Sequence, residues 1–185
     1  MIIGERVRLR AMEKEDLPAF VRWFNDPEVR RNLMMVQPLS MGQEEKWYAD
    51  ILNLPVDEQP LCIEVKQGED WSLIGNLGFM HINQHDRSAE IGISIGEKRF
   101  WNQGYGTEAM RLMVGHGFEN LNFNRIYLQV YETDPRGKRC YEKVGFSVDG
   151  RLRQARFLEG RYADVFIMSI LKSEWKIEKK IGGNE

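Results

Sequence analysis

Four patterns follow one another in the middle of this chain, and their order restricts the fold more than any other feature: a strand, a glycine-punctuated loop, a helix and a second strand. The first strand pattern covers residues 88–95, the helix pattern runs from Tyr105 to about residues 119–122, and the second strand covers residues 125–131. Short links in this order favour a right-handed crossover, in which the two strands run parallel. The glycine loop then lies at the carboxyl end of a parallel strand.

The loop has the features of a phosphate cradle. Gly104 and Gly106, two residues apart, allow a tight turn and a close approach of the backbone to a ligand. The amide groups in the first turn of the following helix lack partners within the helix and point toward an anion at its end. The stretch from Trp101 to Ala109 therefore predicts a phosphate-binding site, and a tight turn that binds nothing is the alternative.

The strand before the loop has one face with room for a ligand. Its alternation places Ala89, Ile91, Ile93 and Ile95 on one face and Glu90, Gly92 and Ser94 on the other. The second face is small and polar and carries a single carboxylate. A ligand is expected beside this strand.

Composition excludes several classes of protein. The 185 residues are 42% hydrophobic and 29% charged, which is typical of one globular domain, here taken as residues 1–175. A net charge of -2 argues against a general nucleic-acid binder, and no apolar run is long enough to span a membrane. Two distant cysteines, three histidines without zinc-ligand spacing and no basic-then-apolar leader indicate a cytoplasmic protein without a metal.

The remaining patterns surround the crossover. Ser40 and Gln43 form a capping-box signature, Asp134-Pro135 begins a helix that Gly145 ends, and Glu159-Gly160 is a turn. Gly75 and Gly78 predict bends or bulges. Helices are expected at residues 13–25, 28–33 and 40–54, and strands at 7–10, 60–66, 72–82, 146–153 and 162–171. The charged tail from Lys172, above all residues 176–185, is expected to fray.

Four segments together resemble the GNAT superfamily of acyl-CoA-dependent N-acetyltransferases. They are Trp23 to Val29, Ala89 to Gly92, Gln103 to Ala109, and Cys140 to Phe146, in family-like order and spacing. Within the superfamily the chain is similar to the ribosomal-protein amino-terminal and polyamine acetyltransferases. The resemblance implies an α+β fold: a central mixed, mostly antiparallel sheet of about seven strands, flanked by helices, with a parallel strand pair splayed at the cofactor site.

The resemblance also implies an acetyl-CoA site. The amides of Gln103, Gly104, Tyr105, Gly106 and Thr107 would bind the pyrophosphate, and the backbone of Ile93, Ser94 and Ile95 would pair with the pantetheine arm. On the later helix, Asp134 would contact the pantetheine arm or the loop, or only cap the helix. One basic residue of this helix would meet the 3'-phosphate: Lys138 is the first candidate, Arg139 and Lys143 are the alternatives to it, and a solvated face is the structural alternative for all three.

Two residues are expected to carry the chemistry. Tyr141 matches the family's tyrosine that protonates the departing thiolate, and Glu90 would accept the proton of the amine directly or through water. Each has a structural alternative: Tyr141 as a core aromatic, and Glu90 as an exposed strand carboxylate. The acceptor would be a small-molecule amine or a protein amino terminus, in a pocket formed by the early helices, and the family's closing strands allow a homodimer.

Two positions depart from the family pattern. Trp101 stands where the family commonly has Gln or Arg, which removes a side-chain contact but not the amide cradle. Asp134 stands where the family often has Asn, and an ionised Asp accepts hydrogen bonds but cannot donate them.

Two other functions remain open at this point. Gly104 to Ala109 also fits the dinucleotide fingerprint G-x-G-x-x-A, with Glu132 in the place of its ribose-binding acid. A dinucleotide-dependent oxidoreductase would, however, need more strand–helix pairs after the loop than this chain provides. The other alternative is an acyl-CoA-binding or sensor module without turnover.

Overall fold

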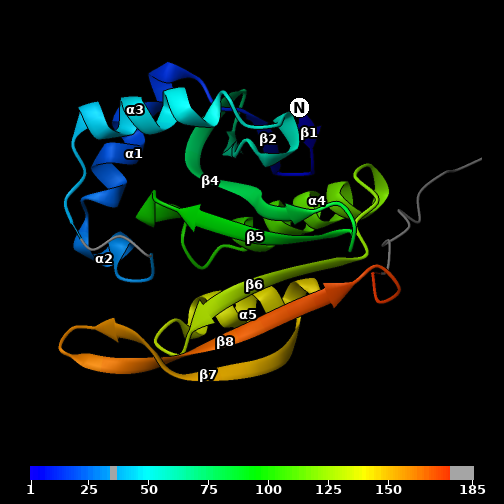
Figure 1. Ribbon diagram of the computed structural model, residues 1–185. Helices are drawn as coiled ribbons and strands as arrows, with labels where there is room; N and C mark the ends of the chain where they lie inside the picture. Colours follow the sequence, from blue (N-terminus) through cyan, green and yellow to red (C-terminus); the bar gives the residue numbers. More distant parts are fainter. Residues whose placement is uncertain (34–36, 176–185) are drawn as a thin grey trace, which may run out of the picture.

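The computed structural model describes residues 1–33 and 37–175, and within them eight strands form one sheet (Figure 1). Across the sheet the order is β1 (Ile2–Ile3), β2 (Val7–Ala11), β3 (Leu61–Gln67), β4 (Asp70–Asn83), β5 (Ser88–Ile95), β6 (Arg125–Tyr131), β8 (Arg161–Leu171) and β7 (Ser147–Leu158). Neighbouring strands run antiparallel except β5 and β6, which run parallel. The predicted fold class is confirmed, and β1 is an addition too short to show an alternating pattern.

The helices match the sequence patterns, with shorter bounds. They are α1 (Leu17–Phe24), α2 (Pro27–Arg30), α3 (Met41–Ile51), α4 (Tyr105–Glu119) and α5 (Pro135–Val144), with 3-10 turns η1 (Lys14–Asp16), η2 (Val56–Glu58) and η3 (Lys98–Phe100). The Ser40–Gln43 capping box at the start of α3 is confirmed. Gly145 ends α5 in the left-handed region (φ 115°), as predicted.

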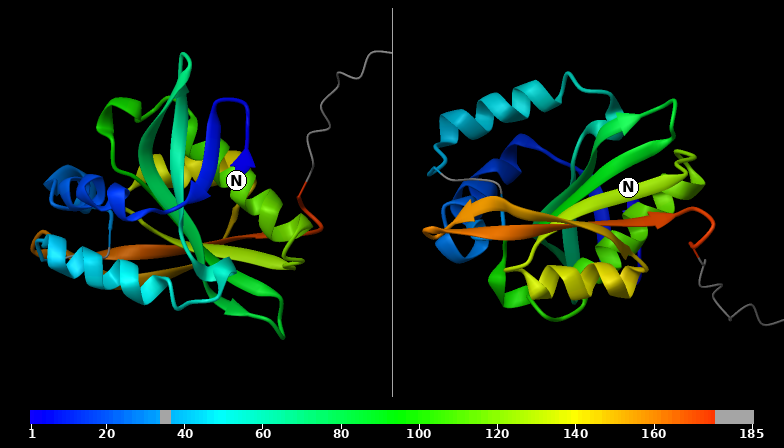
Figure 2. Two further views of the ribbon diagram at one scale, coloured as in Figure 1. Left: turned by 90° about the horizontal axis from the view of Figure 1, so that it is seen from above. Right: turned by 60° about the horizontal axis from the view of Figure 1, so that its bottom comes forward.

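Helices lie on both faces of the sheet (Figure 2). On one face, α4 and α5 cover a core that includes Phe79, Met110 and Ile126. On the other face, α1 and α3 cover a core that includes Phe20, Ile51 and Cys62. The alternation along β5 follows from this arrangement, because Ala89 and Ile91 point into the first core.

Glycines allow close packing at two places. A Cβ on Gly117 would lie 2.8 Å from Phe79 Cζ and 2.9 Å from Ile126 Cδ1, so α4 sits on the sheet at a distance that only glycine permits. A Cβ on Gly75 would lie 2.0 Å from the Ser94 carbonyl oxygen, and the register of β3 with β4 shifts beside Gly75. The bulge predicted there is confirmed.

The parallel pair β5–β6 separates toward its carboxyl ends. The register joins Ser88 to Arg125, Ala89 to Ile126 and Glu90 to Tyr127. Beyond Glu90 the two strands diverge (Figure 1). This is the predicted splay, and it leaves the later backbone of β5 without a strand partner on the side that faces β6.

A dinucleotide-binding interpretation of the glycine loop is wrong. That fold is a doubly wound parallel sheet, whereas after α4 and β6 this chain adds α5 and then the antiparallel hairpin β7–β8. The β7 strand is longer than predicted, because a register shift between Leu152 and Arg156 lets its pairing with β8 continue to the Glu159-Gly160 turn.

The fraying expected from Lys172 onward is wrong for the first residues of the tail. Trp175 packs against Phe118 at a ring distance of 6.0 Å, and its indole donates to Glu119 Oε1 at 3.3 Å. The ring contact and the hydrogen bond anchor the turn after β8. Residues 176–185 lie outside the described part of the chain. None of the described helices combines the length and the apolar character needed to cross a membrane.

Candidate active site

The glycine loop joins the end of β5 to the start of α4 through two left-handed residues. Asn102 has φ 60° and Gly104, the N-cap of α4, has φ 86°. The second value favours glycine, because a side chain there would strain the backbone. The loop thus turns sharply and brings the N-terminus of α4 to the open side of β5.

Amides at this helix end are available to an anion. The first α4 backbone bond runs from Glu108 N to the Gly104 carbonyl at 3.0 Å, so the N–H groups of Tyr105, Gly106 and Thr107 precede the helical bonding pattern. Gly106 also leaves space, because a Cβ there would stand 3.7 Å from Ile95 Cγ1 and 3.9 Å from Cys140 Sγ. The helix dipole adds to the attraction for negative charge.

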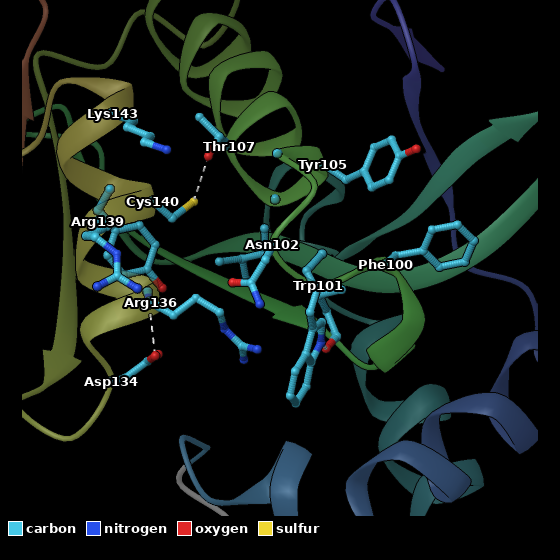
Figure 3. A pocket seen from close by; sticks show the side chains of 16 residues that line it. Phe100, Trp101, Asn102, Tyr105, Thr107, Asp134, Arg136, Arg139, Cys140 and Lys143 are labelled. Atoms are coloured by element: carbon cyan, nitrogen blue, oxygen red, sulfur yellow. Dashed lines mark hydrogen bonds between the residues drawn. The ribbon is translucent and has the colours of Figure 1, made fainter.

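These amides open into a cavity of about 230 Å³ between β5, the loop, α4 and α5 (Figure 3). The walls are Ile93, Ile95, Phe100, Trp101, Asn102, Gly104, Tyr105, Gly106, Thr107, Asp134, Arg136, Gly137, Arg139, Cys140, Tyr141 and Lys143. The splay of β5 from β6 makes the room for it. The helix amides and the basic side chains of this lining suit an anionic ligand.

One stripe of α5 forms the basic wall of the cavity. Arg136, Arg139, Cys140 and Lys143 recur at helical spacing and line it together. The wall also contains Asp134, whose carboxylate accepts the Gly137 amide at 2.9 Å as the α5 cap. Three cations facing one carboxylate give the cavity a positive character suited to phosphate groups.

Eight of the predicted site residues line the cavity, among the residues that the structure describes. They are Ile93, Ile95, Gly104, Tyr105, Gly106, Thr107, Asp134 and Tyr141. Tyr105 contributes its backbone there, because its ring points away and packs edge-to-face on Phe100 at 5.8 Å (Figure 3). The carboxylate of Asp134 serves as the helix cap, which was one of its two predicted roles.

Four predicted residues lie off the lining. The Lys138 ammonium faces the Phe166 ring at 5.0 Å and Glu142 at 3.5 Å, on the side of α5 that is turned toward β8. The Gln103 side chain donates to the Arg99 carbonyl at 2.5 Å. Ser94 and Glu90 point to the other face of the sheet, because they occupy the alternate positions of β5.

Arg136 was missed by the sequence prediction, and Arg139 and Lys143 were named only as alternatives to Lys138. The helical spacing 136, 139, 140, 143 could have identified all three, since it places them on the same face as Cys140.

Trp101 supports the loop and the strand. Its indole N–H donates to the Ile95 carbonyl at 2.7 Å, and the Arg136 guanidinium lies 3.7 Å from the ring centroid. Because the Gly96 amide bonds to the Ile74 carbonyl on β4, the backbone groups of Ile95 point the opposite way, into the splay. The Ile95 carbonyl already accepts the Trp101 indole N–H. At this residue only the backbone amide is therefore left for the predicted pairing with the pantetheine arm.

Tyr141 lies in the cavity wall, partly buried, with its ring edge-to-face on Phe146 at 6.2 Å. Among the described residues its hydroxyl has no hydrogen-bond partner. Burial, with a smaller contribution from Cys140, raises the pKa of Tyr141 above its usual value. The phenol therefore keeps its proton throughout the neutral range and is available as a donor.

Glu90 lies at the fork of the splay, where β5 and β6 still pair. Its carboxylate contacts His81 Nδ1 at 2.9 Å and accepts the Gln129 amide at 3.3 Å. The side chain is 15% exposed, whereas that of His81 is 71% exposed. The Glu90 carboxylate is thus in contact with a side chain that is open to solvent.

Comparison with known proteins agrees with this geometry. A family model described as an acetyltransferase (GNAT) domain matches residues 6–147. The chain belongs to the GNAT acetyltransferase family.

Relatives and solved structures of this family cover almost the whole chain. The N-acetyltransferase p20 of Bacillus licheniformis, itself uncharacterised, is 30% identical over 171 residues, which are 92% of this chain and 96% of p20. The spermidine N(1)-acetyltransferase of Vibrio cholerae is 28% identical over 94% of this chain and 97% of its own. A crystal structure of spermidine N-acetyltransferase from Vibrio cholerae with CoA and spermine has a TM-score of 0.83 at 29% identity, covering 92% of this chain and 98% of that one.

Within the GNAT family, the two departures at Trp101 and Asp134 both have local structural roles. Trp101 bonds the Ile95 carbonyl, and Asp134 caps α5 with a carboxylate that needs only to accept. No group of three or more His, Cys, Asp or Glu side chains in the described part of the chain is arranged to hold a metal ion.

Proposed function

We propose that this GNAT protein transfers the acetyl group of acetyl-CoA directly to a primary amine. The cavity at the N-terminus of α4 carries the proposal, because it combines free helix amides, three cations and a splayed strand pair. The similarity to a spermidine N-acetyltransferase whose crystal structure contains CoA supports the same donor. One acyltransferase domain over residues 1–175 and a cytoplasmic location complete the proposal.

The donor is held from both walls of the cavity. Amides from Gln103 to Thr107 bind the pyrophosphate, and Arg139 and Lys143 on the α5 wall neutralise phosphate charge. The backbone of Ile93 and the Ile95 amide pair with the pantetheine arm, as an added strand would. Held in this way, the thioester lies in the splay, between the two faces of the sheet.

Tyr141 protonates the departing sulfur. As the amine nitrogen bonds to the acetyl carbon, the carbon–sulfur bond breaks, and the phenol donates its proton to the thiolate. The raised pKa of Tyr141 makes it a weaker acid than a free phenol. The buried wall also raises the pKa of a thiol beside it. The proton transfer therefore depends on how close the phenol lies to the sulfur and on the burial that both groups share.

Glu90 removes the proton that the amine loses. An amine with a pKa near 10 is mostly protonated at neutral pH and cannot attack until a base has accepted a proton. Glu90 stands at the fork of the splay with its contacts to His81 and Gln129, which hold the carboxylate in place. The acceptor then approaches from the face opposite α4 and α5.

Two measurements test this proposal. Acetyl-CoA should raise the melting temperature of the protein, and NAD and NADP should not. Acetyl-CoA should then release free thiol in the presence of one or more amines from a panel of polyamines, aminoglycosides, amino acids and peptides with free amino termini. Tight CoA binding without thiol release from any of them would favour the acyl-CoA sensor. Stabilisation by NAD alone would refute the transferase.

The acceptor supported by the comparisons is a polyamine, since spermidine acetyltransferase of Vibrio cholerae is similar to this chain both in sequence and in structure. The charges near α2 favour a second candidate. Arg31 Nη2 pairs with Glu159 Oε2 at 2.8 Å, and Arg156 Nη2 donates to the Leu33 carbonyl at 3.0 Å. These contacts hold the end of α2 against the β7–β8 hairpin.

Several arginines at this junction lack acidic partners. Arg30 and Arg161 form no ion pair within the described residues, and the buried Nε of Arg156 has no acceptor there. Such a surplus repels a polycation and attracts carboxylates. An acidic peptide amino terminus is therefore the second candidate acceptor. If an acidic peptide is the substrate, its kcat/KM should exceed that of spermidine and should fall as salt is added. A higher kcat/KM for spermidine would favour the polyamine as the acceptor.

A homodimer through β7 is the assembly that we propose. This strand lies at the edge of the sheet and exposes Val148, Leu152 and Phe157. An unpaired edge with apolar side chains favours pairing with a second copy. The molar mass in solution tests it, and a monomer at all concentrations would refute it.

A further inference from the structure

Arg6, which immediately precedes β2, reaches the back of the glycine loop nearly a hundred residues later in the chain. Its Nη1 donates to the Gln103 carbonyl at 3.2 Å, and its guanidinium lies 4.8 Å from the centroid of the Tyr105 ring. A Cβ on Gly104 would stand 3.3 Å from Arg6 Nη2. This arginine therefore lies directly against the peptide that joins Gln103 to Gly104.

Glu108 fixes the direction of the arginine. Its Oε1 accepts the backbone amides of Arg6 at 2.7 Å and Val7 at 3.1 Å, while its Oε2 accepts Arg6 Nε at 3.0 Å. The carboxylate lies in the first turn of α4, where the helix dipole favours a negative charge. The main chain and the side chain of Arg6 are thus both tied to the helix that the loop begins.

The hydrogen bond to the Gln103 carbonyl sets the direction of the Gly104 amide. In a trans peptide the carbonyl and the following N–H point in opposite directions, and the described chain contains no cis peptide. With the carbonyl held toward Arg6, the Gly104 N–H points away from it, to the side where Gly104 lines the cavity. A glycine itself holds no such preference, because it tolerates both orientations of the preceding peptide.

We propose that Arg6 is a positioning residue that holds the 103–104 peptide with its amide directed at the pyrophosphate of the donor. This inference rests on the proposed function, since it assigns a part in the binding of acetyl-CoA. Arg6 acts from behind the loop and does not touch the donor. Its removal lets the peptide turn, which replaces an amide donor by a carbonyl oxygen facing the phosphate.

The test compares donors with and without a pyrophosphate. Dissociation constants of CoA and pantetheine are measured by calorimetry for the wild type and for Arg6→Met. A hydrogen bond to a charged group is worth about a ten- to hundredfold change in affinity, so CoA binding should weaken by about that factor. Pantetheine binding should be unchanged, and kcat at saturating acetyl-CoA should stay within about twofold.

Three variants separate orientation from charge and from folding. Arg6→Lys keeps the positive charge but loses the several hydrogen bonds that a planar guanidinium can donate at once, so it should recover only part of the CoA affinity. Arg8→Met removes the next arginine of the same segment, which pairs with Glu64, and should leave the ratio of the two constants unchanged. Glu108→Ala should weaken CoA binding as much as Arg6→Met does. The double variant should bind CoA no more weakly than either single variant. The Arg6 side chain is 48% exposed and borders a hollow of about 980 Å³, so its replacement is expected to fold.

Particular results would overturn the positioning role. Equal losses for CoA and pantetheine would make Arg6 a general structural residue, and wild-type affinity in Arg6→Met would remove its role. Full recovery by Arg6→Lys would assign the effect to charge alone. A wild-type protein that binds no CoA would instead refute the proposed function, which is a different result from CoA binding that ignores Arg6.

Discussion

Glu44 offers a quantitative test of the fold through pH. This residue of α3 is 3% exposed, and its Oε1 has no hydrogen-bond partner within the described residues. Burial raises the pKa of Glu44 from its ordinary 4.5 to about 7. Replacement by Gln keeps the size of the side chain and removes the charge.

The sign follows from proton binding. Between pH 4.5 and 7 the unfolded chain releases the Glu44 proton while the folded chain retains it, so stability falls as pH rises and levels off above pH 7. A tenfold change in an ionisation constant corresponds to about 1.4 kcal/mol. The pKa of Glu44 in the folded state thus gives a cost of at most about 3 kcal/mol at pH 8, and of about 0.8 kcal/mol at pH 5.

Thermal unfolding at the two pH values measures this cost. Since 1 kcal/mol shifts the melting temperature of a chain of this size by about 2–4 °C, Glu44→Gln should melt up to about 10 °C above the wild type at pH 8. The gain at pH 5 should be about 3 °C or less. Glu45→Gln, on the same helix but exposed and paired with Lys14, is the control and should show little change at either pH. An equal shift of Glu44→Gln at both pH values would refute the buried ionisation.

Three further predictions concern the active site. Tyr141→Phe should lower kcat by about a hundredfold or more, the usual contribution of a general acid, while calorimetry should find CoA affinity within about twofold; an unchanged kcat would return Tyr141 to a packing role. Glu90→Gln should alter the pH dependence of kcat/KM, measured by thiol release from pH 6 to 10, and an identical profile would mean that Glu90 is not the base. Trp101→Phe loses the bond to the Ile95 carbonyl, worth about 1 kcal/mol, so the melting temperature should fall by about 2–4 °C while CoA affinity stays within about threefold. A loss of affinity above tenfold would show that the indole takes part in donor binding.

Much of this fold could be predicted because its signals are local. The capping box at Ser40, the left-handed Gly145 and the alternation along β5 each depend on a few neighbouring residues, and the structure confirms all three. The parallel pair β5–β6 followed from the crossover rule, which depends only on element order. The tail after β8 was mispredicted, since the anchoring of Trp175 depends on Phe118, which is distant in sequence.

The parts of the active site that could be predicted from the sequence are likewise those with local signals. The loop and its helix were recognisable because glycines and a helix start within one short stretch define an anion-binding end. Lys138, which the sequence predicts at the site, is turned by α5 toward Phe166, whereas Arg136, which the sequence does not predict there, lines the cavity. Charge type can be read along a chain, but the direction of each charge depends on which side of α5 packs on the sheet.

The sequence by itself determined the order of elements, the turn at Gly104 and the family to which the chain belongs, because each depends on residues close together in the chain or on their order. The tertiary structure alone decided how the loop is held. Trp101 bonds the Ile95 carbonyl within one short segment, whereas Arg6, the residue immediately before β2, donates to the Gln103 carbonyl. No spacing in the sequence encodes that second contact, because it exists only once the sheet has brought the beginning of the chain beside the N-terminus of α4.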